Sequence, residues 1–428
     1  MKKHLKPLLC GATALVAASA TLALASPFSS ALVQMNIAVY GDAPYGTTPT
    51  DTSETLATPA FIQAINSQSD IGLVLHVGDI HSGKQFCTLS YDGTIFELWR
   101  KYQRPLVYTP GDNEWADCHK YTSPAAPGEG GGLYDSGLGQ IVFDTDARGN
   151  LVDYQGGNPI ANLAKIRSIF FPQVGKALGG GNKDVLSQAQ AFDPAHPTDA
   201  QYVENVMWEQ SGVLFVTLNL PGGSNDDKDI WYKTPTISAD QTTERNNRRA
   251  ANIRWLDAAF ARASADHAKA IVIQEQADMW DLDGKATSHI TEYELYINDI
   301  VEHANPSSVI YTPFTNPILL LDGDSHIYRS DNPLMPSSGT NPCVVEKPQP
   351  AVGPKTTDTI ACGDDDYAHH PAISPSVPNF HRITVHGSTF PLEYTKLHID
   401  PSANVAGGSS TTAFGPFSWI RVLPLESP

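Results

Sequence analysis

The sequence predicts a single α/β domain built on a largely parallel, buried sheet. Two observations carry this prediction: strand-like runs that are apolar almost throughout, and helix-like segments that separate them. Parallel strands covered on both faces are typically continuous apolar runs of this kind. The 428-residue chain is long enough for one large domain or two modest ones, and it carries no internal repeat that would indicate a solenoid.

The first part of the chain alternates strands with helices. Apolar, extended runs at 35–41, 71–78 and 105–109 predict buried strands. Between them, the segments at about 58–67 and 95–103 have helical spacing. This alternation is typical of strands that lie parallel in one sheet.

The middle of the chain is less regular. From 119 to about 200 glycine-rich runs interrupt the pattern, which indicates a surface insertion with a short helix around 160–170. The stretch YVENVMWEQSGVLFVTLNL then predicts a β-hairpin that turns at Ser211 and Gly212.

A long helix follows at about 238–264. Ser238 can cap its start, and Ile253, Leu256 and Phe260 fall on one face. This apolar face predicts a helix that packs against the sheet.

The last third continues with a buried strand (KAIVIQEQ), a helix near 291–304 and another strand (PILLLDGD). Residues 331–379 are rich in proline and lack any period, so we expect a second long loop there. The alternating runs FHRITVHG and LEYTKLHI predict a terminal β-hairpin.

The chain opens like a secretory signal peptide. A basic start, an apolar stretch and the small-residue motif Ala23-Leu24-Ala25 predict that residues 1–25 are removed near Ser26. Residues 26–428 would then form one exported domain, secreted or periplasmic. A retained membrane anchor is the alternative. No later stretch reaches the ~18–20 apolar residues of a spanning helix, so no membrane span is expected in the mature form.

The protein is strongly acidic. Its formal net charge is −18, and removal of a leader with three lysines and no acids makes it −21. Such a surface repels nucleic acid and anionic membranes, which argues against both as standing partners. A small phosphorylated substrate, drawn in by local cations, remains compatible with this charge.

Four cysteines remain after the leader: Cys87, Cys118, Cys343 and Cys362. An even number in an oxidising compartment indicates two disulfides, for which three connectivities exist. The pairs that are local in sequence, Cys87–Cys118 and Cys343–Cys362, are favoured. Free buried thiols are the alternative.

Carboxylates stand just beyond the ends of four predicted strands. They are Asp42, Asp79, Asp112 and Asp324, and His326 follows the last of them by two residues. Sites in open α/β sheets form beyond the carboxyl ends of the strands, so we expect these side chains to meet. Clustered carboxylates repel each other unless a cation compensates, which predicts one or two bound metal ions. Four unrelated surface turns are the alternative.

These stretches resemble the ordered motifs of the calcineurin-like metallophosphoesterases, the superfamily that includes the purple acid phosphatases. GDAPY, GDIHSG, GDNEW, QEQADMW and GDSHIY follow the order and spacing of that family across roughly residues 35–330. The resemblance implies a four-layer αββα sandwich, two divalent metal ions and hydrolysis of a phosphate ester by metal-bound hydroxide.

The resemblance also implies roles for single residues. Asp42 would bind the first metal, and Asp79 would bridge both. Asp112 stands where the family has an Asn ligand. Asp324 replaces the first His of the motif G-H-x-H, whereas His326 retains the second.

Other family positions carry different side chains here. Asn113 stands where the catalytic His is expected, and Pro44 replaces the His after the first Asp. Gln276 occupies the place of the His in the fourth motif, with Gln274 as an alternative alignment. Fewer imidazoles and more oxygen ligands favour Mn, Mg or Ca over Zn or Fe.

Three neighbouring side chains complete the candidate site. Tyr45 could supply a phenolate, contact substrate or simply pack as an aromatic ring. His81 could take over the proton-donor or phosphate-binding role, and Glu114 is expected to brace its turn.

Together these features predict an exported, metal-dependent phosphoesterase that acts on a small phosphorylated substrate. A non-catalytic descendant of the same fold, which binds a ligand or partner through a remodelled cleft, is the main alternative. A structural calcium protein is the second alternative.

Overall fold

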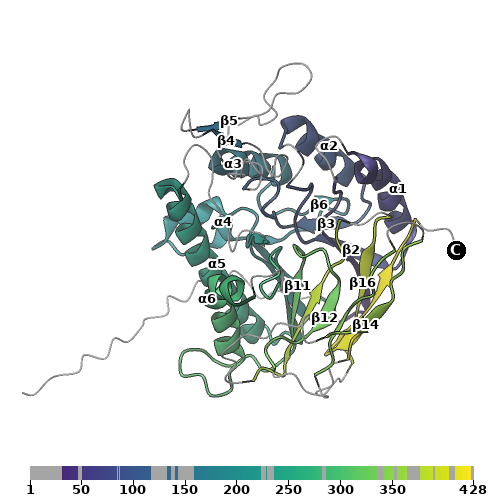
Figure 1. Cartoon of the computed structure of the whole chain (residues 1–428). Helices are drawn as coiled ribbons and strands as arrows, with labels where there is room; N and C mark the ends of the chain where they lie inside the picture. Colours follow the sequence, from purple (N-terminus) through teal and green to yellow (C-terminus); the bar gives the residue numbers. More distant parts are fainter. Residues whose placement is uncertain are drawn as a thin grey trace, which may run out of the picture.

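Two β-sheets pack face to face in the computed structural model of the protein, and helices cover the outer face of each sheet (Figure 1). This arrangement confirms the predicted four-layer αββα sandwich. The structure describes residues 31–46, 51–83, 85, 87–116, 133–135, 140–142, 159–222, 228, 236–281, 286–335, 341–350, 354–363, 376–388, 391–403 and 410–425. The predicted leader, residues 1–25 with cleavage at Ser26, lies outside these ranges.

The first sheet has seven strands in the order β17-β18-β16-β1-β2-β3-β6. Its strands are β1 (Met35–Tyr40), β2 (Ile71–His76), β3 (Pro105–Tyr108), β6 (Leu178–Gly179), β16 (Tyr394–Ile399), β17 (Ala413–Phe414) and β18 (Phe417–Val422). β1, β2 and β3 are parallel, as their apolar sequences predicted, and β16 joins β1 in the antiparallel sense.

The second sheet has nine strands in the order β14-β13-β12-β15-β11-β10-β9-β8-β7. Its strands are β7 (Leu186–Ser187), β8 (Val206–Gln210), β9 (Val213–Thr217), β10 (Ala270–Gln274), β11 (Ile318–Asp322), β12 (Arg329–Asp331), β13 (Val344–Glu346), β14 (Thr359–Ala361) and β15 (Phe380–Thr384). The centre, from β9 to β15, is parallel. A separate hairpin pairs β4 (Leu133–Asp135) with β5 (Gln140–Val142).

The helices are divided between the two outer faces. They are α1 (Ser53–Ser67), α2 (Leu89–Trp99), α3 (Pro159–Phe170), α4 (Gln188–Ala191), α5 (Ala239–Ala265) and α6 (Ala286–Ala304), with a 3-10 turn at Pro197–Gln201. Side chains of α1, α2 and α3 join the apolar core on the outer face of the first sheet. Those of α5 and α6 join the core on the outer face of the second sheet.

A third core fills the space between the sheets. Leu73 and Leu75 of β2 belong to the same buried cluster as Val272 of β10 and Leu321 of β11. Alternate residues of each strand therefore face either this inner core or a helical layer, which explains why the strands are apolar almost throughout.

Most predicted elements are confirmed. In α5, Ser238 accepts a hydrogen bond from the Gln241 N–H and so caps the helix, while Leu256 and Phe260 are buried. The predicted hairpin is β8–β9, where Ser211 and Gly212 both have positive φ angles. α6 begins five residues before the expected start at 291.

The predicted terminal hairpin of FHRITVHG and LEYTKLHI is wrong. The first run forms β15, a central strand of the second sheet that pairs with β11 and β12. The second forms β16 in the first sheet, between β1 and β18. The chain therefore crosses from one sheet to the other after β15. All five residues of β15 are buried, as expected of a central strand rather than of a half-exposed hairpin.

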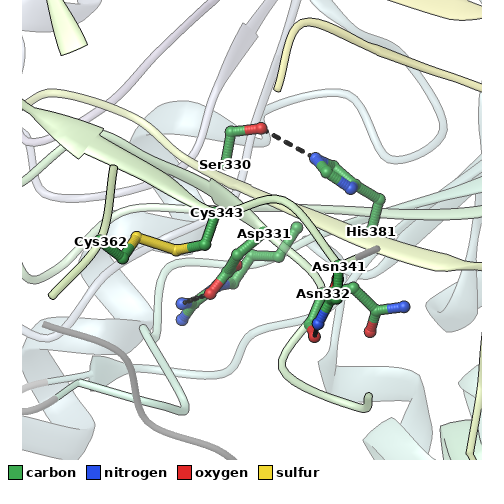
Figure 2. The surroundings of a disulfide bond; sticks show 8 residues. Ser330, Asp331, Asn332, Asn341, Cys343, Cys362 and His381 are labelled. Atoms are coloured by element: carbon green, nitrogen blue, oxygen red, sulfur yellow. Dashed lines mark hydrogen bonds and ion pairs between the residues drawn. A yellow bond between two sulfur atoms is a disulfide. The ribbon is translucent and has the colours of Figure 1, made fainter. Parts of the chain in front are cut away.

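The proline-rich segment 331–379 is more structured than expected, because it holds β13 and β14. Figure 2 shows the predicted disulfide between Cys343 and Cys362, which lies beside this part of the sheet. Cys87 is also disulfide-bonded, but its predicted partner Cys118 lies outside the described residues. None of the helices in the described ranges has the length and apolar character needed to cross a membrane.

Candidate metal centre

Asp112 follows β3, and the other three carboxylates predicted to form the site sit in tight turns after β1, β2 and β11. Asp42, Asp79 and Asp324 have φ angles of 47°, 57° and 67°, in the left-handed region. Asp adopts this conformation more readily than most residues. The turns let each strand end abruptly while its Asp side chain stays at the end of the sheet.

Backbone hydrogen bonds tie these turns to each other across the two sheets. The N–H of Asp42 donates to Gly78 O at 2.9 Å, and that of Ala43 donates to Asp79 O at 3.0 Å. The N–H of Asp324 donates to Asp42 Oδ1 at 3.0 Å. The strand ends of β1, β2 and β11 therefore meet, as the sequence predicted.

Glycines allow the carboxylates to lie against the backbone of neighbouring turns. A Cβ atom on Gly111 would stand 2.0 Å from Asp79 Oδ1, and one on Gly323 would stand 2.4 Å from Asp42 Oδ2. These contacts leave Asp42 and Asp79 almost completely buried. The same turn residues thus end the strands and close the site.

Asp42, Asp79 and His326 can hold one metal ion. One ligand atom from each lies within 4.8 Å of the other two, and His326 Nε2 is 3.6 Å from Asp42 Oδ1. Asp42 Oδ2 is buried, and among the described residues no donor lies within hydrogen-bond distance of it. An unsatisfied, buried carboxylate oxygen beside an imidazole fits a bound cation.

The second predicted position is arranged around Gln276. Its Nε2 lies 3.2 Å from Asp79 Oδ2, 3.3 Å from Asp112 Oδ1 and 3.4 Å from Asp324 Oδ1. Its Oε1 accepts a hydrogen bond from the Gly222 N–H, which sets the direction of the amide. Gln276 therefore meets the three predicted ligands but presents them with an NH₂ group, whereas metal ligation requires its oxygen.

Gln274, the alternative for the fourth motif, points elsewhere. It is buried between the sheets, and its Nε2 donates to the backbone oxygen of His76 at 2.8 Å. This hydrogen bond joins β10 to β2. Gln274 is thus a link between the two sheets, and Gln276 is the residue that reaches the carboxylates.

Asn113 and Tyr45 border the carboxylates. Asn113 donates from its backbone N to Asp79 Oδ1 at 3.2 Å and from Nδ2 to Asp79 Oδ2 at 2.6 Å. The Tyr45 hydroxyl lies 3.4 Å from Asp79 Oδ2 and 3.0 Å from His326 Nε2, and it also contacts the Asn113 amide. Tyr45 is therefore part of the site rather than a ring that only packs.

His81 lies in the loop after β2 and is fully buried. Its Nδ1 is 3.0 Å from Ser82 O, and its Nε2 is 3.5 Å from Cys87 Sγ. The Nδ1 contact ties the ring to its own loop, and the Nε2 contact is to a sulfur atom of a disulfide. The proton-donor role stays a prediction. Glu114 accepts a hydrogen bond from the Gly111 N–H at 2.8 Å and so braces its turn as expected.

The crowding of acids shifts the ionisation of the whole site. Burial, and then the charge of Asp324, raises the pKa of Asp42 well above its usual value. Burial and the neighbouring Asp112 do the same for the pKa of Asp79. Burial also lowers the pKa of His326 to about 4, so its imidazole is neutral and able to ligate. A bound cation would offset the repulsion among the carboxylates.

One neighbouring group escaped the sequence interpretation. His386 follows β15, and its ring nitrogens lie 2.9 Å from Glu393 Oε2 and 3.3 Å from Glu346 Oε2. Arg421 joins the same acids. The next residue, Gly387, packs so closely on Asp42 that a Cβ atom would stand 2.2 Å from Asp42 Cβ. The sequence signal for this group is the Val-His-Gly that follows β15, in the same position as the Gly-Asp turns after the other strands. It was overlooked because the run was interpreted as part of a hairpin.

No family model matches this chain, and no curated protein does either. Among solved structures, the chain is similar to a purple acid phosphatase isolated from yellow lupin (Lupinus luteus) seeds. The identity is 11%, the TM-score is 0.35, and the match covers 88% of this chain and 50% of that one. The chain thus spans about half the length of that structure. Residues of the site, rather than this likeness, carry the functional proposal.

Proposed function

We propose that the protein is a metal-dependent phosphoesterase of the calcineurin-like metallophosphoesterase type, which hydrolyses esters of small phosphorylated molecules. One observation carries the proposal: Asp42, Asp79, Asp112, Asp324 and His326 converge from four strand ends of two different sheets. Carboxylates gathered in this way need a compensating cation.

The donor set assigns residues to each metal position. Asp42, Asp79 and His326 would hold the first ion, and Asp79, Asp112 and Asp324 would hold the second. When bound, divalent ions lower the pKa of water and stabilise negative charge on phosphoryl oxygens. Because five of these six contributions are carboxylates, Mn, Mg or Ca are the preferred ions.

The uncharged side chains at the edge of the site would bind the phosphoryl group. The Asn113 amide can donate a hydrogen bond to a phosphoryl oxygen, but it has no proton to give to a leaving group. Burial raises the pKa of Tyr45 well above its usual value, so its hydroxyl stays protonated. It can donate a hydrogen bond to a phosphoryl oxygen, but the raised pKa makes it a poor general acid for a leaving group. We therefore expect esters with good leaving groups to react much faster than alkyl esters, because poor leaving groups need a proton donor.

A second candidate function is that of a non-catalytic binding protein. The observation that favours it is the Gln276 amide, which satisfies three carboxylates at the place where a second ion would bind. Hydrolysis by the metal-loaded protein separates the two candidates, because a binding protein would take up metal and phosphate without turnover.

We further propose that the protein acts outside the cytoplasm, secreted or in the periplasm. The Cys343–Cys362 disulfide supports this location, since such bonds persist in oxidising compartments. The leader at residues 1–25 would direct the export.

Chelation followed by return of single metals tests the enzymatic proposal. Hydrolysis of an aryl phosphate monoester and a diester is measured after treatment with EDTA and addition of Mn, Mg, Ca or Zn. We expect chelation to abolish hydrolysis, and Mn or Mg to restore it best. If none of the four metals restored hydrolysis of either ester, the binding-protein candidate would be the better account.

A further inference from the structure

A second cluster of metal-ligating side chains lies in the outer helical layer, away from the strand ends. Asp257 comes from α5, and Asp299 and His303 come from α6, where their spacing of four residues places them on one face. One ligand atom from each lies within 4.8 Å of the other two. His303 Nε2 is 2.9 Å from Asp257 Oδ1 and 3.8 Å from Asp299 Oδ2.

The carboxylate of Asp299 is only half satisfied. The Tyr311 hydroxyl donates to its Oδ1 at 3.3 Å, but its Oδ2 is buried and has no hydrogen-bond partner in the part of the chain that the structure describes. The side chain is 8% exposed, and Oδ2 points toward His303 and Asp257. Within the described ranges, neither carboxylate forms an ion pair with Lys or Arg. A buried, unpaired carboxylate beside a second one requires a proton or a cation.

Aromatic rings fix the imidazole in place. The His303 ring stacks on Phe260 at a centroid distance of 4.2 Å and on Tyr311 at 3.8 Å. Tyr311 thus orients two of the three candidate ligands, since its hydroxyl also holds Asp299. Such outer contacts are what a preorganised metal site needs. Asp257 is the most exposed of the three, since 34% of its side chain is accessible to solvent.

We propose that Asp257, Asp299 and His303 bind one divalent transition-metal ion of the zinc class, which joins α5 to α6. Ligands about 2.1 Å from a tetrahedral zinc ion lie roughly 3.4 Å apart. His303 Nε2 is 2.9 Å from Asp257 Oδ1 and 3.8 Å from Asp299 Oδ2, so both separations are within about 0.5 Å of that value. The imidazole supplies the nitrogen ligand that divalent transition metals take, and carboxylates bind the same ions, so zinc serves as the probe for this site. Water completes the coordination through the exposed side of Asp257.

Zinc stoichiometry tests this proposal in the full-length, chelated protein. Native mass spectrometry counts the zinc ions bound by the wild type and by Asp299→Asn, a variant that keeps the side-chain shape. We expect the variant to bind one ion fewer per chain. His196→Gln, a change at an exposed histidine, is the matched control and should leave the count unchanged.

Thermal unfolding gives an independent measurement. Zinc should raise the Tm of the wild type more than that of Asp299→Asn. In the presence of a chelator, Asp299→Asn should have a Tm equal to or higher than that of the wild type, because it lacks the unpaired buried carboxylate. Equal zinc counts and equal Tm shifts in the two proteins would overturn the proposal, and so would a wild type that takes up no zinc. If Asp299→Asn does not fold, His303→Gln is measured by the same two criteria.

Discussion

At the level of single residues, the direction of the Gln276 amide bears on the proposed second metal position. Its Oε1 is held by the Gly222 N–H, so its NH₂ group faces Asp79, Asp112 and Asp324. A cation can enter only if the amide turns over and leaves that N–H unsatisfied. An unsatisfied buried group costs about 1–3 kcal/mol, and because about 1.4 kcal/mol corresponds to tenfold in affinity, a cost in the middle of this range exceeds tenfold.

Gln276→His should therefore tighten binding of a second ion. The imidazole offers a ligand nitrogen without an NH₂ group in the way. Calorimetric titration of chelated protein with Mn²⁺ should show a weak second site in the wild type and a site at least about tenfold tighter in the variant. Identical titrations for the two proteins would mean that the amide does not limit occupancy.

His81→Ala distinguishes a structural from a catalytic histidine. Because both ring nitrogens contact the surrounding loop, we expect the variant to lose about 1–3 kcal/mol of stability while its rate ratio between aryl and alkyl phosphates stays unchanged. Urea unfolding and rates on both esters provide the two readouts. A wider gap between the esters at full stability would restore the proton-donor role predicted from the sequence.

Sequence patterns predicted which side chains lie close together, but not the direction in which each side chain points its polar atoms. Asp42, Asp79 and Asp324 were recognisable because each follows a Gly at the end of an apolar run. The direction of the Gln276 amide depends on Gly222, which is 54 residues distant in sequence. No local pattern encodes such a contact, since it arises only when β9, β10 and β11 lie side by side.

At the scale of elements, the turns after the strands must bring backbone and carboxylate into direct contact. Gly111→Ala tests this requirement, because the added Cβ would stand 2.0 Å from Asp79 Oδ1. We expect the variant to lose metal and stability together, by about 1–3 kcal/mol as for other overpacked sites. Metal content and thermal unfolding report both effects.

Gly93→Ala is the matched control for this substitution. Gly93 lies in α2, and a Cβ atom there has no neighbour within 4 Å. Alanine in a helix interior should stabilise the protein by about 0.5–1 kcal/mol and leave the metal content unchanged. If both alanine variants behaved alike, close packing of the turn would not explain the glycine at position 111.

Whether a segment forms a strand or a helix was easier to predict than which strands it pairs with. The run FHRITVHG has an alternating pattern, which suggested a half-exposed hairpin strand, yet all five residues of β15 are buried. His381 and Arg382 supply the polar positions, and both are satisfied inside the protein by Ser330 and Asp331. The polar residues of this run are paired inside the protein, so their presence in the sequence suggested a half-exposed hairpin strand where the structure has a central one.

At the scale of the whole molecule, buried acids make stability depend on pH. Burial raises the pKa of Glu54 to about 8 and that of Asp299 to about 8. The folded state then binds protons that the unfolded chain has released, so this contribution to stability is lost as the pH rises toward 8. Buried His76 and His381 act in the opposite sense only below about pH 6.5, since their pKa values are lowered to about 4 and about 3.

Glu54→Gln should reduce the loss of stability between pH 6.5 and 8. The wild-type free energy of unfolding falls by up to about 1.4 kcal/mol per pH unit for each such carboxyl group, and the variant lacks one of them. Urea unfolding of chelated protein at several pH values measures the slope. Glu97→Gln, at an exposed position, should leave the slope unchanged. A wild type that gains stability over this range would contradict the assignment.

In the proposed enzyme, carboxylates from two sheets hold the catalytic metal, and both metal positions depend on Asp79. The most direct measurement is elemental analysis of the purified full-length protein and of Asp79→Asn, with aryl phosphate hydrolysis assayed on the same samples. We expect the wild type to contain stoichiometric divalent metal and to hydrolyse the ester, and Asp79→Asn to have lost most of both. Asp240→Asn, an exposed carboxylate in the first turn of α5, serves as the control and should match the wild type. Metal content and hydrolysis that survive in Asp79→Asn would contradict the account.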